Sequence, residues 1–255
     1  MDTNFATEVR IEQSDRERAK TLASALPRLG LLALIAVLLL PLWLVRYPPV
    51  VDYPDHLARS FILVHLKDPA YRFGSVYSSD WGPYPYLGMD VLLVVFQHFL
   101  PAETAGRVLL SICVLAFPIA GWWFLRQANP GHDELALWTL LLSFNPFFLD
   151  GFINWQLGLA VGFCALGLWL RYLEKSTALR WVALLITTTC CYFMHLIAFG
   201  FAAFVVLVYS LAKPVRFRAL ICSTGAFLPG AVLYFVSRIR HWKCSSAGCL
   251  GRNGL

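Results

Sequence analysis

The chain has 255 residues, of which 58% are hydrophobic, 15% aromatic and only 14% charged, whereas soluble domains average roughly 45–50% apolar and about 25% charged residues. A soluble fold of this length cannot bury so much apolar surface, so the composition excludes an ordinary globular domain. The formal net charge of +6 comes from short basic clusters between apolar runs. Because this is the pattern of cytoplasmic loops in membrane proteins, we expect membrane lipids and not nucleic acid as partners.

The apolar runs approach the roughly 20 residues that a helix needs to cross a bilayer. Residues 1–28 are polar and longer than the start of a cleaved signal peptide, so the first span, residues 29–45, is expected to be an anchor with a cytoplasmic N-terminus. The sequence predicts an all-α, polytopic transmembrane helix bundle of about seven spans within residues 29–238, followed by an irregular tail at residues 239–255. Hydropathy places the later spans at residues 105–125, 135–149, 152–170, 179–194, 196–211 and 217–236.

The longest predicted connection is an external segment at residues 46–104. Basic clusters at residues 171–180 and 213–218 should be cytoplasmic, and counting spans back from them places the start of the second span outside. The apolar stretch at residues 86–100 is too short to cross comfortably, so we interpret it as an amphipathic or re-entrant helix at the outer surface. With a short helix after Pro54, the loop holds two juxtamembrane helices, and connections of this length usually carry a function.

The sharpest local signal is the sequence VDYPDHLAR at residues 51–59. If a helix begins here, Asp55 and Arg59 lie one turn apart, and two carboxylates and an imidazole converge. Such a group can bind a divalent metal ion or supply a general base, which predicts Asp52 and Asp55 as catalytic residues. Asp52, Asp55 and His56 are the predicted metal ligands, and His56 and Arg59 the predicted substrate-binding residues. Alternatively, the first carboxylate caps the helix, the second complements its dipole, and the other two groups anchor it at the interface.

Other polar residues fall at turns predicted on the same outer face. Asn154 and Gln156 follow the turn between the third and fourth spans, and His195 lies between the fifth and sixth. Polar groups at membrane depth are costly and often functional, so all three are predicted to bind substrate. The alternatives are an interhelical hydrogen bond for the two amides and an interfacial histidine for His195.

The order of these parts resembles the GT-C superfamily of polyprenyl-phosphate-sugar-dependent glycosyltransferases, such as protein O-mannosyltransferases and lipid A aminoarabinose transferases. In that family an acidic motif and two juxtamembrane helices follow the first span. Here DYPDH at residues 52–56 stands at the acidic position, although many members have an adjacent acidic pair. PYPY at residues 83–86 looks like the start of the second juxtamembrane helix, and AGRVLL at residues 105–110 like the start of the second span. The similarity covers roughly residues 29–212.

The resemblance implies a multi-pass protein of the bacterial inner membrane that transfers a sugar from a polyprenyl-phosphate donor to an acceptor in the cell envelope. It implies that Asp52 or Asp55 is the base that activates the acceptor hydroxyl, or part of a metal site that holds the lipid phosphate. Members usually have more spans than this chain, so a truncated, inactive transferase remnant is one alternative. A non-enzymatic membrane protein, such as a transporter or a flippase-like partner, is the other.

Overall fold

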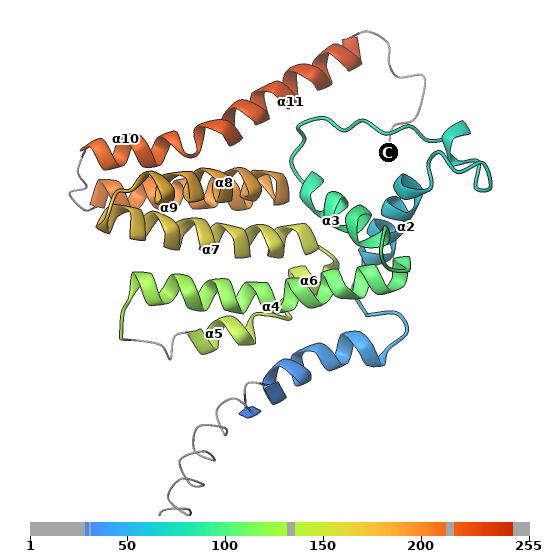
Figure 1. Cartoon of the computed structure of the whole chain (residues 1–255), viewed down its shortest axis with the longest axis horizontal. Coiled ribbons are helices and arrows are strands. Elements are labelled where there is room, and N and C mark those ends of the chain that lie inside the picture. The colour runs from blue at the N-terminus through green and yellow to red at the C-terminus, as the bar shows by residue number, and fades with distance from the viewer. Residues whose placement is uncertain (1–28, 31, 132–135, 213–216, 247–255) are drawn as a thin grey trace, which may run out of the picture. The chain divides into compact units, whose positions relative to one another are not determined.

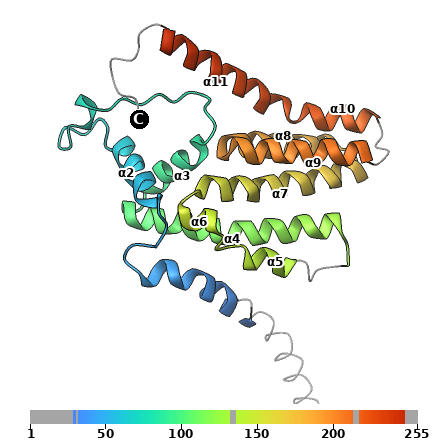
Figure 2. The ribbon, with the colours of Figure 1, turned by 180° about the vertical axis from the view of Figure 1, so that it is seen from behind.

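The computed structural model of the chain describes residues 29–30, 32–131, 136–212 and 217–246. Regular structure within these residues is helical throughout, which confirms the all-α prediction (Figure 1, Figure 2). The chain divides into two compact units, Met1–Pro48 and Pro49–Leu255. The described part of the first unit contains an apolar helix at Leu32–Leu44.

The second unit holds the remaining helices and the candidate site residues. Its helices are α2 (Tyr53–Val64), the 3-10 helix η1 (Phe73–Ser75), α3 (Leu87–Gln97), α4 (Ala102–Ala128), α5 (Ala136–Leu141), α6 (Pro146–Asp150), α7 (Ile153–Glu174), α8 (Ala178–Met194), α9 (Leu196–Ala212), α10 (Phe217–Gly225) and α11 (Leu228–Ser246).

Three helical segments of the described chain are long and apolar enough to cross a membrane: Ala102–Ala128, Ile153–Glu174 and Ala219–Arg240. The helices α3, α8 and α9 and the helix of the first unit are apolar but have fewer than 18 residues. The structure therefore supports a multi-pass membrane protein with three candidate spans, where hydropathy predicts about seven.

The segment predicted as a single span at residues 135–149 is instead broken into two short helices, α5 and α6. The break lies at Asn145, whose side-chain oxygen accepts a hydrogen bond from the backbone N–H of Phe148 at 3.1 Å and so caps a new helix. Pro146 occupies the first position of that helix, where its missing N–H costs nothing. A mean hydropathy taken over 15 residues does not reveal such a helix cap.

The predicted irregular tail is also partly wrong, because α11 continues to Ser246. Residues 247–255, like the predicted cytoplasmic segment at residues 1–28, lie outside the described part of the chain.

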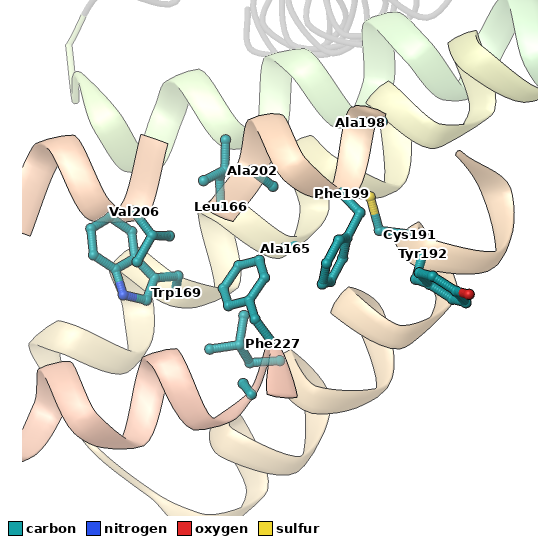
Figure 3. Close-up of a cluster of buried hydrophobic side chains, with 12 residues drawn as sticks. Ala165, Leu166, Trp169, Cys191, Tyr192, Ala198, Phe199, Ala202, Val206 and Phe227 are labelled. Atoms are coloured by element: carbon teal, nitrogen blue, oxygen red, sulfur yellow. The ribbon is translucent and has the colours of Figure 1, made fainter. Parts of the chain in front are cut away.

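The core lies where α7, α8 and α9 meet each other and the junction of α10 and α11 (Figure 3). Trp169 is its largest fully buried side chain and packs edge-on against Tyr209, with ring centroids 5.1 Å apart. On the other side of α7, Gly167 allows α4 to approach, since a Cβ there would lie 2.7 Å from the ring carbon Cε3 of Trp123. Small residues at helix contacts are the usual way in which membrane helices pack closely.

One end of this bundle positions the candidate site. Tyr53, the first residue of α2, packs against Gly106 near the start of α4, where a Cβ would lie 2.9 Å from the ring carbon Cζ. Burial raises the pKa of Tyr53 to about 12, so its phenol stays protonated. At the same end, the hydroxyl of Tyr192 near the end of α8 donates to the carbonyl of Pro83, which precedes α3, at 2.9 Å.

Candidate functional site

The start of α2 is hydrogen-bonded to the turn between α6 and α7. The backbone N–H of Val51 donates to the carbonyl of Leu149 at 2.9 Å, and that of Asp52 to the carbonyl of Asp150 at 3.2 Å. Gly151 follows with φ of +100°, and a Cβ there would lie 2.6 Å from the Cβ of Asp52. Only glycine suits both the backbone angle and the close approach. The segment before α2 and the turn between α6 and α7 thus meet at Asp52.

The four polar side chains that the sequence singles out at this helix do share one cavity. Asp52, Asp55, His56 and Arg59 line an open space of about 440 Å³, together with two apolar residues of α2. We call this space the acidic cavity. Asp52 is the N-cap residue of α2 but makes no capping hydrogen bond with its side chain, so the carboxylate is not committed to the helix end. The alternative interpretation of Asp52 as a helix cap therefore lacks its defining contact.

The imidazole of His56 is held in its neutral form. Burial lowers the pKa of His56, and the nearby guanidinium of Arg59 lowers it further, while the carboxylates of Asp90 and Asp52 act in the opposite direction. Desolvation is the largest of these effects because it penalises the charged imidazolium. A neutral imidazole beside two carboxylates can accept a proton near neutral pH.

Arg59 forms an ion pair with Asp90 on α3. Its Nε donates to Asp90 Oδ1 at 3.1 Å, and its Nη2 donates to Asp90 Oδ2. Asp90 is only 7% exposed, so the paired guanidinium offsets the cost of burying its carboxylate. Sequence reasoning missed Asp90. The signal was present, because it is the single charged residue in the apolar stretch Leu87–Gln97 and a buried charge needs a partner.

A second contact joins the same two helices. Gln97 Nε2 donates to Ser60 Oγ at 2.6 Å, and the Ser60 hydroxyl donates to the carbonyl of Leu57 at 2.9 Å. Arg59 and Ser60 are adjacent on α2, and their partners Asp90 and Gln97 are about two turns apart on α3, so polar contacts connect the two helices at two points. These contacts fix the orientation of the helix face that carries the acidic cavity.

His195 lies apart from the acidic cavity, in the turn between α8 and α9. It is 7% exposed and lies between two rings, those of Tyr86 and Trp155, with centroids 4.7 and 4.9 Å away. Its Nδ1 is buried and has no hydrogen-bond partner among the residues that the structure describes. Burial lowers the pKa of His195 to about 4, so the ring is neutral. His195 does not line the acidic cavity, and its role in binding substrate stays a prediction.

The two predicted amides have different environments. Gln156 is fully buried; its Nε2 donates to the carbonyl of Ser143 at 2.9 Å, and its Oε1 accepts from Asn145 Nδ2 at 2.7 Å. Ser143 and Asn145 lie between α5 and α6, and Nε2 also donates to the carbonyl of Cys113 on α4 at 3.5 Å, which is the interhelical hydrogen bond that was the alternative for Gln156. Asn154 is half-buried, and its Oδ1 accepts from the backbone N–H of Trp155 at 3.0 Å. Neither amide lines a cavity described here, so substrate binding by them stays a prediction.

A metal site is not supported by the geometry. In the described ranges, no three His, Cys, Asp or Glu side chains are grouped so that they hold a metal ion. The predicted ligands Asp52, Asp55 and His56 share a cavity but do not form such a group.

A second cavity, of about 240 Å³, is also lined by Arg59. We call it the aromatic cavity; its lining residues are Arg59, Leu63, Ser78, Ser79, Asp80, Trp81, Tyr84, Pro85, Tyr86, Leu87 and Asp90. Tyr86 has φ of +74°, an uncommon angle for a bulky residue that surrounding contacts must stabilise. The loop before it is held by the hydroxyl of Tyr84, which donates to Asp80 at 2.7 Å, and by Arg240 of α11, which pairs with Asp80 at 3.0 Å.

No protein-family model, no curated protein and no solved structure matches the chain. Its function must therefore be inferred from the residues and their geometry.

Proposed function

We propose that this protein is a membrane glycosyltransferase of the GT-C type, with about seven spans, located in a bacterial inner membrane. It would transfer a sugar from a polyprenyl-phosphate donor to an acceptor of the cell envelope on the external face. The observation that carries this proposal is the acidic cavity, in which two carboxylates, a neutral imidazole and a guanidinium from a single helix are open to a ligand.

The reaction needs one proton acceptor and one site of positive charge. The acceptor oxygen forms a bond to the anomeric carbon while the bond from that carbon to the phosphate oxygen breaks, and the electron pair leaves with the polyprenyl phosphate. The proton of the acceptor hydroxyl passes to the carboxylate of Asp52 or Asp55, with His56 as a neutral base in the same cavity. General-base catalysis of this kind contributes about 10²- to 10⁴-fold in rate.

Arg59 supplies the positive charge. A guanidinium has five N–H donors, and only two of those of Arg59 are used by Asp90, so the others can bind a departing phosphate. Because Asp90 fixes the guanidinium in advance, charge on the leaving group is stabilised without rearrangement. The side chain of Arg59 is 36% exposed, which leaves this edge accessible.

The geometry favours surface chemistry over transport. Transporters place their polar groups near the bilayer midplane, on discontinuous helices. Here the acidic cavity lies at the start of α2, next to the beginnings of α4 and α7.

The test is sugar transfer by the full-length protein in liposomes that contain a radiolabelled polyprenyl-phosphate sugar and envelope acceptors. Asp52→Asn and Asp55→Asn are made singly. The variant that lacks the catalytic base is expected to transfer sugar at least 10²-fold more slowly. Asp68→Asn is the matched control, since Asp68 is a loop carboxylate that lines neither cavity and bonds the backbone N–H of Ala70. Unchanged transfer by both cavity variants would refute the proposal.

A further inference from the structure

We infer that the aromatic cavity is a binding site for one neutral saccharide ring. If the proposed function holds, this ring belongs to the acceptor, which makes the acceptor a glycan rather than a protein or a simple lipid. The first statement stands on the cavity alone, and only the second rests on the proposed function.

The cavity has the apolar surface that a sugar ring needs. Trp81 is 50% exposed and Tyr86 36% exposed although both line a cavity, so their rings are available to a ligand. Tyr84 adds a third ring from the same short loop. Aromatic faces carry partial negative charge and attract the polarised C–H groups on the faces of a pyranose.

The same cavity offers polar groups suited to hydroxyls. Ser78 and Ser79 contribute hydroxyls that both donate and accept, and Asp80 and Asp90 contribute carboxylate oxygens that accept only. Arg59 contributes N–H donors beyond those used by Asp90. Adjacent hydroxyls of a sugar, each both donor and acceptor, match such a mixed set.

Charge in the cavity favours a neutral ligand over an anion. Both carboxylates of the lining are already paired with a cation, Asp90 with Arg59 and Asp80 with Arg240. The N–H donors of Arg59 that Asp90 leaves free are proposed to bind the phosphate from the acidic cavity, so an anion in the aromatic cavity would meet the carboxylates of Asp80 and Asp90, whereas a neutral ring meets no net charge.

The size and position of the cavity narrow the ligand further. Its volume of about 240 Å³ is below the roughly 300–1,000 Å³ of cavities that hold drug-sized ligands, which suits a single ring. Arg59 lines both cavities, so the aromatic cavity adjoins the cavity that holds the carboxylates proposed as base. This is the position expected for an acceptor.

The binding test uses the full-length protein in detergent and saturation-transfer NMR with methyl α-glucoside, methyl α-mannoside and methyl α-galactoside as probes. At least one neutral glycoside is expected to bind, and Trp81→Ala should weaken that binding at least 10-fold, while Trp81→Phe retains most of it. Trp138→Ala is the matched control, because Trp138 is 65% exposed on α5 and lines neither cavity. The inference is overturned if no glycoside binds, if Trp81→Ala has no effect, or if glucuronate or inorganic phosphate competes more strongly than the glycosides.

Failure of this inference is distinguishable from failure of the proposed function. If Asp52→Asn or Asp55→Asn abolishes transfer but Trp81→Ala does not change glycoside binding, the proposed transferase function stands and the saccharide site is refuted. If glycoside binding depends on Trp81 but transfer is unaffected in both aspartate variants, the saccharide site stands and the proposed transferase function is refuted.

Discussion

The core of α7, α8 and α9 and the end of the bundle at α2 and α3 are held together by different forces. The core cluster consists almost entirely of apolar side chains, so in a bilayer its cohesion comes mainly from close packing and not from the exclusion of water. At α2 and α3, in contrast, the contacts are an ion pair and a hydrogen bond between side chains. The stability of the core therefore depends mainly on side-chain packing, and that of the candidate site mainly on charge and protonation.

Tyr192 joins the two regions. Its ring belongs to the core cluster, and its hydroxyl donates to the carbonyl of Pro83 in the loop that lines the aromatic cavity. A substitution that tests one region alone should therefore be made at another residue. Four such substitutions are expected to have successively smaller effects.

Trp169→Ala is expected to have the largest effect, about 3–5 kcal/mol of unfolding free energy, since it opens a cavity in a closely packed core. Trp169→Phe is the control; it keeps a ring and removes an indole N–H that is buried without a partner among the described residues. It should cost far less. Denaturant titration of the purified protein measures both, and equal losses would contradict packing as the dominant force.

Acid should weaken the end of the bundle where His195 lies. Because burial lowers the pKa of His195 to about 4 from 6.5, the unfolded chain binds more protons than the folded protein between these values. Stability should therefore fall as pH drops from about 6.5 to about 4, by roughly 3 kcal/mol. His195→Gln should flatten this dependence in thermal unfolding scans, whereas an unchanged slope would assign it to another group, with His56 the first to replace.

Breaking the ion pair of α2 and α3 should have an intermediate effect. Asp90→Asn leaves Arg59 without its carboxylate and should cost about 1–3 kcal/mol, less than for a fully buried pair because the guanidinium is partly exposed. A double-mutant cycle with Asp90→Leu and Arg59→Met isolates the pair energy. If the single losses simply add, the two residues do not interact in solution.

The pair of Asp80 and Arg240 should contribute least. Both side chains are about half exposed, and such pairs contribute about 0–1 kcal/mol. Asp80→Arg should lower stability slightly, and adding Arg240→Asp should restore it. A loss above this range that the reversed pair does not restore would show that Asp80 acts through its bond with Tyr84 instead.

Local signals in the sequence gave correct predictions where the structure depends on neighbouring residues. The helix that starts beside Pro54, the short helix from Leu87 and the turn at His195 follow from proline, chain length and hydropathy over a few residues. Asp52, Asp55, His56 and Arg59 line one cavity because they are separated by at most two helical turns, and their catalytic and binding roles stay predictions.

Long-range contacts were not predictable in this way. Arg59 and Asp90 are 31 positions apart, and the aromatic cavity depends on a loop whose strained Tyr86 has no local sequence signature. The break in the predicted span at residues 135–149 was missed for a related reason. Hydropathy averages over residues 135–149 do not register the hydrogen bond by which Asn145 starts a new helix.

Residues 51 and 52 donate backbone hydrogen bonds to the turn before α7. An insertion in that turn should therefore be tolerated less well than an insertion near η1. An added residue at Gly151 would displace the first carboxylate of the acidic cavity directly. The segment around η1 lies between α2 and the lining of the aromatic cavity, so extra residues there can bulge outward. Homologous chains should accordingly vary in length near η1 while keeping the α6–α7 turn at constant length.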